Sequence, residues 1–373
     1  MESPGKRFWS SQIVVSFLLL SVLPNCSGLT ATQLTYRSSD ALVEFENLTS
    51  DSSFEHLITN IEADLYIEGN ILIGGMASIQ TLNLTSKIML VGGSSPGYEN
   101  GRGDEVRVFY AFIHQLSKET VLLSDLYNNC IRKLNRGENG VEDYAGRCRE
   151  QGEKDGVGQE ARLFKPRYMA SDSSHKAYTL VYILTNEGNT LRRLNTSGLQ
   201  VDTVSSLPKG AAFISMWIDL NYPMEVVLAT NMELYRVGVA TLSSGSVKVT
   251  QLPLSNITNA LPLHEGLYLF AGGNTNGLYL VDIHATEVLT ICDKNSVSDV
   301  TQSECYIFAD SMLGLAHNTL YIISGTSLKS LPVSIRAIVN KGTQVAAAGG
   351  SSSVTSISIL YILLELMIFK MLL

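Results

Sequence analysis

The sequence predicts an all-β protein, and three observations support that prediction. A short pattern near residue 101 returns about 55 residues later. Pairs of short β-rich segments recur six times at intervals of about 40 to 60 residues, which leaves room for four strands and their turns. No helical periodicity of any length occurs outside the two termini. Because one such unit cannot bury both of its faces alone, the predicted fold is a ring of six units, a six-bladed β-propeller.

The repeat is clearest between two neighbouring units. Residues 101–109 read GRGDEVRVF and residues 156–164 read GVGQEARLF, so Gly, Gly, Glu, Arg and Phe stand at the same places. The agreement continues between CIRKLN at 130–135 and TLRRLN at 190–195. The basic residues of this region fit the alternation of a half-exposed strand better than a patch for a polyanion. They are Arg132, Lys133, Arg136, Arg192 and Arg193.

Each of the six units contains a tandem pair of strands. The first strands of the pairs are expected at 71–73, 121–123, 181–183, 226–228, 267–269 and 320–322. The second strands are expected at 79–82, 131–134, 191–194, 234–237, 278–281 and 328–331. Strands at 41–45 and 335–339 are candidates for pairing the two ends of the ring.

One segment resembles an NHL-repeat unit. The run AGRCREQGEKDGVGQEARLFKP, which begins at Ala145, has the Ala-Gly, the Gly-rich Asp-Gly-x-Gly loop and the later Ala, Phe and Pro of that pattern. It is followed by LVYILTNEGNTLRRLN, which reads as two strands joined by an Asn-containing turn. Residues 92–135 are a poorer match. The resemblance implies a six-bladed NHL-like (TolB-like) propeller, but it does not fix a function, because such propellers host adhesion, sensing and enzymatic roles.

The N-terminus has the layout of a cleaved secretory signal. Lys6 and Arg7 precede an apolar stretch at 13–23, and the small residues that follow predict removal of residues 1–28. Beyond the signal, four Asn-x-Ser/Thr patterns fit N-glycosylation. They lie at Asn47, Asn83, Asn195 and Asn256. The predicted ectodomain therefore spans 29–340 and lies outside the cell.

The C-terminus predicts a membrane anchor. A small, polar spacer at 341–356 precedes a hydrophobic tail at 357–373. This order resembles the signal for a glycosylphosphatidylinositol (GPI) anchor, and a single transmembrane helix is the alternative. The candidate attachment residues are Ala347, Ala348, Gly349, Gly350 and Ser351. Either anchor places the ectodomain on the extracellular face of the plasma membrane.

The extracellular location guides the interpretation of the cysteines. Loss of Cys26 with the signal leaves four of the five cysteines in a compartment where thiols oxidise. Cys130 and Cys148 flank a hairpin with a tight turn at Asn139-Gly140, and pairing around that turn places them opposite each other to within one residue. The expected bridges are Cys130–Cys148 and, by elimination, Cys292–Cys305.

A polar residue recurs where the innermost strand of each blade should end, just before each tandem pair. The six residues are Glu68, His114, Asp172, Asp219, His264 and His317. Arranged around an axis, three imidazoles and three carboxylates would be ligands for zinc or, through the carboxylates, calcium. Some enzymes on this fold, the amidating lyase and the paraoxonase-like lactonases, use central metals. The preferred interpretation is that these are ordinary polar turn residues.

The leading functional prediction is a non-enzymatic, cell-surface binding, adhesion or receptor-like module that recognises an extracellular protein or glycan without a cofactor. No Gly-x-Ser-x-Gly elbow, His-Glu-x-x-His helix or phosphate loop is present, so the sequence offers no catalytic residue. A formal net charge of -8 makes nucleic acid a poor partner. The alternative prediction is a metal-dependent hydrolase or lyase that holds zinc or calcium in the central channel of the propeller.

Overall fold

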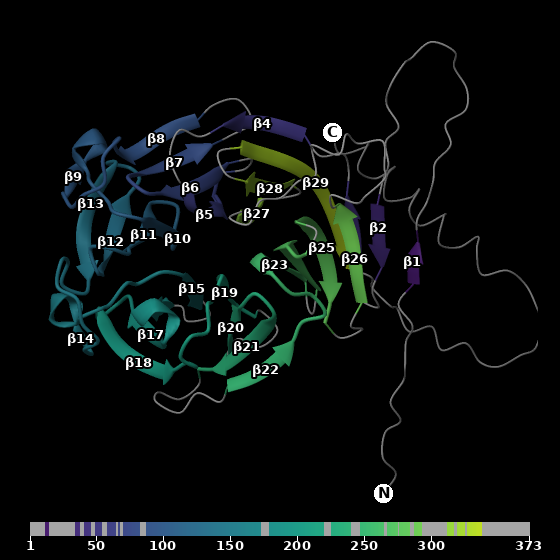
Figure 1. Ribbon diagram of the computed structural model, residues 1–373. Coiled ribbons are helices and arrows are strands. Elements are labelled where there is room, and N and C mark those ends of the chain that lie inside the picture. The colour runs from purple at the N-terminus through teal and green to yellow at the C-terminus, as the bar shows by residue number, and fades with distance from the viewer. Residues whose placement is uncertain are drawn as a thin grey trace, which may run out of the picture. The chain divides into compact units, whose positions relative to one another are not determined.

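In the part of the chain that the structure describes, the regular structure consists of β-strands and three short 3₁₀ turns (Figure 1). The computed structural model describes residues 12–14, 34–37, 41–45, 49–53, 58–64, 66–67, 70–82, 87–172, 179–219, 225–239, 247–264, 267–274, 276–283, 287–292, 312–316, 319–324 and 327–337. The predicted spacer and tail, and the predicted signal peptide apart from 12–14, lie outside these ranges. Within them, no helix is long and apolar enough to cross a membrane. The 3₁₀ turns are η1 (Gly103–Glu105), η2 (Gly158–Glu160) and η3 (Asn186–Gly188).

Five antiparallel sheets of four or five strands form the blades of a propeller. Blade 1 comprises β5 (Ile58–Ala63), β6 (Ile71–Gly75), β7 (Ser78–Leu82) and β8 (Lys87–Gly92). Blade 2 comprises β10 (Ala111–Gln115), β11 (Thr120–Asp125), β12 (Cys130–Asn135), β13 (Gly140–Ala145) and β9 (Gly101–Arg102). Blade 3 comprises β15 (Met169–Asp172), β16 (Leu180–Thr185), β17 (Thr190–Asn195), β18 (Gln200–Ser206) and β14 (Gly156–Val157). Blade 4 comprises β19 (Ser215–Ile218), β20 (Glu225–Ala229), β21 (Glu233–Gly238) and β22 (Val247–Gln251). Blade 5 comprises β23 (Ile257–His264), β24 (Leu267–Gly272), β25 (Gly277–Asp282) and β26 (Glu287–Cys292).

Among the described residues, the sixth predicted unit does not form a separate blade, so five blades are found and the predicted count of six is wrong. Its strands belong to a seven-stranded sheet, the closing sheet. This sheet contains β27 (Met312–Ala316), β28 (Thr319–Ser324), β29 (Ser327–Ala337), β1 (Gln12–Val14), β2 (Leu34–Arg37), β3 (Ala41–Phe45) and β4 (Thr49–Ser53). The cause is the length of β29, whose 11 residues pair with β28 on one edge and with both β4 and β3 on the other.

The closing sheet joins the two ends of the propeller. Ile335 of β29 pairs with Val43 of β3, which confirms the predicted pairing of 41–45 with 335–339 as far as the described residues reach. On the inner side, β27 contacts β5 of blade 1 and β23 of blade 5. The closing sheet therefore lies between the last blade and the first (Figure 1).

Each strand of the six predicted tandem pairs is confirmed, from β6 and β7 to β28 and β29.

The core consists of apolar side chains packed between neighbouring blades. Between blades 2 and 3, Leu122 and Ile131 pack in one buried cluster with Val181 and Leu194. Full burial of an aliphatic side chain of this size stabilises the folded state by roughly 1.5 to 3 kcal/mol. Contacts between sheets thus hold the ring together, as a repeat architecture requires.

The predicted disulfide between Cys130 and Cys148 is confirmed, but not in the predicted geometry. The two Cα atoms are 4.8 Å apart. In the hairpin, Asn135 pairs with Gly140, so the turn comprises residues 136–139 instead of a tight Asn-Gly turn. Cys130 begins β12, whereas Cys148 lies beyond the end of β13 in the following loop. The bridge therefore ties that loop to the blade. The predicted Cys292–Cys305 bridge falls outside the described residues.

A fully buried arginine, Arg132, organises the interior of blade 2. Its guanidinium donates to the Asp125 carboxylate at 3.0 Å and to the carbonyl oxygens of Arg107 and Glu99, each at 2.6 Å. Neither Arg132 nor Asp125 is exposed to solvent. Burial raises the pKa of Asp125 above its ordinary value, and hydrogen bonds from Asn128 and Arg132 oppose that effect. The expectation that Arg132 lies on a half-exposed strand is wrong.

Arg192 occupies the equivalent position in blade 3 and is also fully buried. It donates to Glu153 at 3.3 Å, to Asp155 at 2.7 Å and to the Arg162 carbonyl at 3.3 Å. The half-exposed-strand prediction therefore fails here as well. In both blades the arginine faces inward, where backbone carbonyls of the loop before the innermost strand and nearby carboxylates accept its hydrogen bonds.

Replacement of Arg132 by Met should destabilise the protein by about 3 to 5 kcal/mol, because it leaves the Asp125 carboxylate buried without its cation. The matched control is Arg102→Met, since Arg102 pairs with Glu138 on the surface, where both side chains are more than half exposed. That change should cost less than about 1 kcal/mol. Urea unfolding of both variants measures the difference. Equal destabilisation of the two would contradict the role assigned to Arg132.

Candidate functional site

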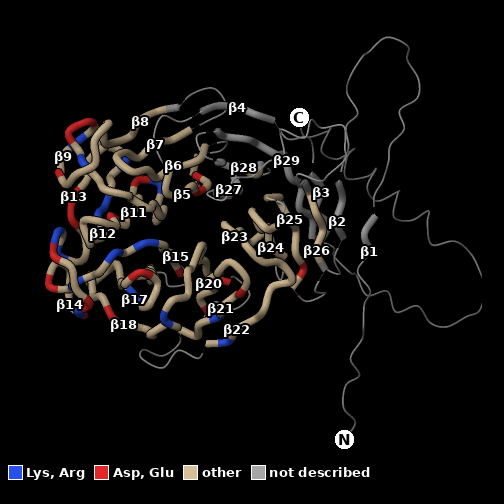
Figure 2. The backbone as a smooth tube through the Cα atoms, viewed as in Figure 1, with Lys and Arg blue, Asp and Glu red and all other residues tan. Residues whose placement is uncertain are grey.

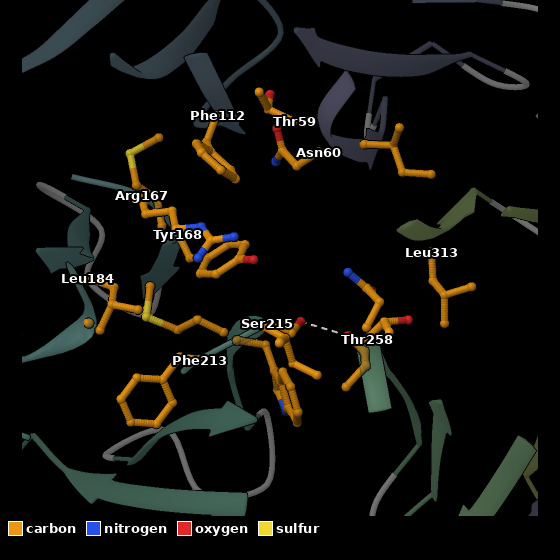
Figure 3. Close-up of a pocket in the computed structure, with 18 of the residues that line it drawn as sticks. Thr59, Asn60, Phe112, Arg167, Tyr168, Leu184, Phe213, Ser215, Thr258 and Leu313 are labelled. Carbon is orange, nitrogen blue, oxygen red and sulfur yellow. Dashed lines mark hydrogen bonds between the residues drawn. The ribbon is translucent and has the colours of Figure 1, made fainter. Parts of the chain in front are cut away.

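The innermost strands surround a central cavity of about 890 Å³ (Figure 3). Residues of β5, β10, β15, β19 and β23, together with the loops before them, form most of its wall. Much of that wall is apolar or aromatic, for instance Phe112, Leu184, Phe213, Met216, Trp217 and Leu313. Pockets of this size and character enclose most of the surface of a small ligand. Charged residues instead concentrate on the outer strands and loops of blades 2 and 3 (Figure 2).

Several polar side chains of the wall tie neighbouring innermost strands together. Thr59 donates to the Ala111 carbonyl, and Asn60 makes a reciprocal pair of 2.9 Å hydrogen bonds with the backbone of Ile113. Ser215 donates to the Ala260 carbonyl at 2.6 Å. An innermost strand has one edge without a partner strand, so these side chains satisfy backbone groups that would otherwise lack a partner. Their hydrogen-bonding capacity is thus largely used within the protein.

Both acidic residues of the wall are also engaged. The Glu62 carboxylate lies 3.0 Å from Nδ1 of His114 and accepts a 2.9 Å hydrogen bond from the backbone amide of Gln115. At the other acidic position, Glu187 accepts a hydrogen bond from the Lys165 ammonium group. Each negative charge of the wall is therefore next to a basic side chain.

Arg167 and Tyr168 project into the cavity from the residues directly before β15 (Figure 3). The Cζ atom of Arg167 lies 4.7 Å from the centroid of the Tyr168 ring and 5.5 Å from that of Phe112. The two rings meet edge to face at 5.3 Å. Cation–π contacts of this kind hold a guanidinium in place without using any of its N–H donors.

The backbone around Arg167 is fixed on both sides. Its amide donates to the Leu184 carbonyl at 2.8 Å, and the Leu184 amide donates to the Tyr168 carbonyl at 2.9 Å. Just upstream, the Phe164 amide donates to Glu153, the residue that the buried Arg192 holds. The interior of blade 3 thus positions the cation that faces the cavity.

The predicted ring of metal ligands is described only in part. Glu68 and His317 lie outside the described residues, as does the side chain of His264. His114 lies near the end of β10, Asp172 at the end of β15 and Asp219 directly after β19. They are absent from the cavity wall, to which these strands contribute mainly their first residues.

The described members of that ring contact other side chains. His114 lies beside Glu62, as above, and Arg236 donates to Asp219 at 2.8 Å. In the part of the chain that the structure describes, no three His, Cys, Asp or Glu side chains are grouped so as to hold a metal ion. The donor set best placed to meet a ligand is instead Arg167 with the Tyr168 hydroxyl.

Sequence reasoning missed Arg167 and Tyr168. The repeat comparison ended at Pro166, the last residue of the pattern that resembles an NHL unit. A usable signal existed, because the next residues lead into an innermost strand, whose beginning must face the axis of a propeller. The same reasoning places Phe112 in the wall, near the start of β10.

Solved structures similar to this one are β-propeller proteins. The auxiliary nutrient binding protein from Bacteroides thetaiotaomicron aligns with a TM-score of 0.52 and 8% identity over 80% of this chain and 77% of that chain. Virginiamycin B lyase from Staphylococcus aureus aligns with a TM-score of 0.49 and 9% identity over 78% and 99%. The nidogen/laminin complex aligns with a TM-score of 0.44 and 10% identity over 69% and 91%. The fold is a β-propeller.

At such low identity the similarity shows the fold alone, and the fold assignment rests on the first of these structures together with the sheet topology. No protein-family model matches the sequence, and no curated protein does. Membership of the NHL family therefore stays a prediction.

The Tyr168 hydroxyl should ionise at a higher pH than an ordinary tyrosine. Burial raises the pKa of Tyr168 above its usual 10.0, and the nearby Arg167 charge opposes the shift only partly. Since the pKa is higher in the folded state, the stability that this group contributes is complete below pH 10 and is lost as the pH rises through the folded value. NMR of tyrosine-labelled protein, with Tyr168→Phe to assign the resonance, measures the titration. A midpoint at or below that of the unfolded protein would contradict the assignment.

Proposed function

We propose that this protein is a cell-surface binding module, adhesive or receptor-like, that recognises an extracellular protein or glycan through the central cavity. The observation that carries the proposal is the cavity itself, with an apolar and aromatic wall and with Arg167 and Tyr168 directed inward. A rigid ring that presents a few polar groups within an apolar pocket is suited to recognition, because little ordering is needed on binding.

Two features support an extracellular setting. The Cys130–Cys148 disulfide is of a kind that persists in oxidising compartments. Of the predicted glycosylation sites, Asn256 is exposed, and Asn195 is half-buried at the end of β17, next to the turn to β18. Asn47 and Asn83 lie outside the described residues. Both described positions are thus at least partly accessible to solvent.

The test compares two variants with the same new side chain. Ala212 is an exposed residue of the cavity wall, so Ala212→Trp should obstruct the cavity without removing a hydrogen bond. Val249 is half-exposed on β22, the outermost strand of blade 4, so Val249→Trp is the control. Cells that display the full chain are screened against libraries of secreted proteins and glycans. A ligand should bind the wild type and the control equally, and bind Ala212→Trp roughly tenfold or more weakly, about 1.4 kcal/mol. Binding that survives Ala212→Trp would contradict the proposal.

The second candidate function is the metal-dependent hydrolase or lyase, with zinc or calcium held by the predicted ring of Glu68, His114, Asp172, Asp219, His264 and His317. The observation in its favour is that the three described members stand at equivalent ends of neighbouring innermost strands. Elemental analysis of the purified protein separates the two candidates, since only the second requires stoichiometric zinc or calcium.

The proposed anchor is a GPI group attached within 347–351. A permanent helix over 357–373 would be short for a bilayer and would hold Glu365 within it at a cost of a few kcal/mol, whereas a tail that is removed avoids this cost. Phosphatidylinositol-specific phospholipase should therefore release the protein from intact cells. Retention on the cells, with recovery of a peptide that contains Met371, would show a transmembrane anchor instead.

A further inference from the structure

We infer that the central cavity binds a carboxylate on an otherwise apolar peptide segment of a partner protein, with Arg167 as the carboxylate-binding residue. This inference rests on the proposed function and adds to it the chemical class of the ligand. The argument begins with the hydrogen-bonding groups of the wall that are still free to meet a ligand.

Most polar groups of the wall already have partners. Thr59, Asn60 and Ser215 bond to neighbouring innermost strands, as described above, and Thr258 donates to the Ala271 carbonyl at 3.2 Å. The acidic groups are paired as well. Among the described residues of the wall, those whose side chains have polar groups and make no hydrogen bond include Arg167, Tyr168 and Asn259.

Arg167 differs from the other cations near the cavity. Lys165 is neutralised by Glu187, whereas within the described part of the chain Arg167 has no ion pair and no side-chain hydrogen bond, and its guanidinium lies near the Tyr168 and Phe112 rings. Its five N–H donors are therefore available in a fixed fork, which matches the two oxygens of a carboxylate. The rings also restrict the side chain, so less conformational entropy is lost on binding.

The charge around Arg167 favours a single negative charge. Lys165 offsets the charge of Glu187, so Glu62 and Arg167 are the other charged side chains of the described wall, and the chain as a whole carries a formal net charge of -8. A phosphate or a polyanion would need several cations to offset this field, whereas one carboxylate needs one. The cavity therefore selects a monocarboxylate.

The rest of the wall favours a peptide over a glycan. Leu184, Phe213, Met216, Trp217 and Leu313 offer apolar surface, and several polar side chains of the wall, such as Ser215, already bond within the protein. Most hydroxyls of a buried sugar would lose water without gaining a partner, at a cost of about 1 to 3 kcal/mol each. A peptide segment with aliphatic or aromatic side chains beside a carboxylate fits both the apolar surface of the wall and Arg167.

The test uses short peptides of Ala, Leu, Phe and Trp, acetylated at the N-terminus and made both as C-terminal free acids and as C-terminal amides. Binding to the purified full-length chain is measured by ligand-observed NMR. Free acids should bind at least about tenfold more tightly than the matching amides. Arg167→Gln should abolish that preference. Arg167→Lys should keep only part of it, because an ammonium cannot bind both oxygens in the same plane. Arg102→Gln, on the surface of blade 2, should leave the preference unchanged.

The possible outcomes separate this inference from the proposed function. Equal binding of acids and amides, or acid binding that survives Arg167→Gln, would overturn the inference. A sialylated glycan that binds through the cavity in preference to every peptide would overturn it too, while leaving the proposed function intact. Absence of any ligand whose binding is lost in Ala212→Trp would instead reject the proposed function.

Discussion

The interaction between a buried arginine and a carboxylate is the constraint on which blades 2 and 3 depend. Arg132 and Arg192 stand at the same place in the repeat, and each supplies donors to the loop that leads into the innermost strand of its blade. The repeat preserves the cation but not the origin of the carboxylate. In blade 2 it comes from Asp125 at the end of β11, whereas the equivalent position of blade 3 is Thr185 and the carboxylates come from Glu153 and Asp155. What is kept is the charge balance around the arginine.

The consequence for the cavity is that stability and recognition use different polar groups. The side chains that tie innermost strands together, such as Asn60 and Ser215, donate hydrogen bonds to backbone carbonyls and stiffen the wall. Arg167 is held by aromatic rings instead, which leaves its donors free. Among the described residues of the wall, Arg167 is a cation without an ion pair in a largely apolar space, which is the arrangement expected of a selective binding pocket, since orientation is fixed by few polar groups.

The sequence predicted the strands of the tandem pairs, the Cys130–Cys148 bridge and the pairing of the two ends, because alternation, spacing and compartment are local or compositional signals. Prediction from the sequence failed where contacts between residues distant in the chain determine the structure. Arg132 lies in a strand whose alternation predicts a half-exposed face, yet loop acceptors distant in the chain turn that side chain inward. The hairpin register was misjudged because Asn139 has a positive φ within a longer turn. Neither Arg167 nor Tyr168 belongs to a motif, and only the topology places them at the cavity. The count of six blades failed because spacing does not reveal that β29 recruits N-terminal strands.

The pairing of β29 with β3 also bears on how the chain reaches its folded state. Each blade is made of consecutive strands, so its contacts are local and can form as synthesis proceeds. The contact between Val43 and Ile335 instead joins strands that are nearly 300 residues apart in the chain, and it requires β29. Until that strand is made, β3 and β4 present unpaired edges, which are templates for association with other chains. A chaperone that covers strand edges would thus be most needed late in synthesis, when five blades have formed and the ring is still open.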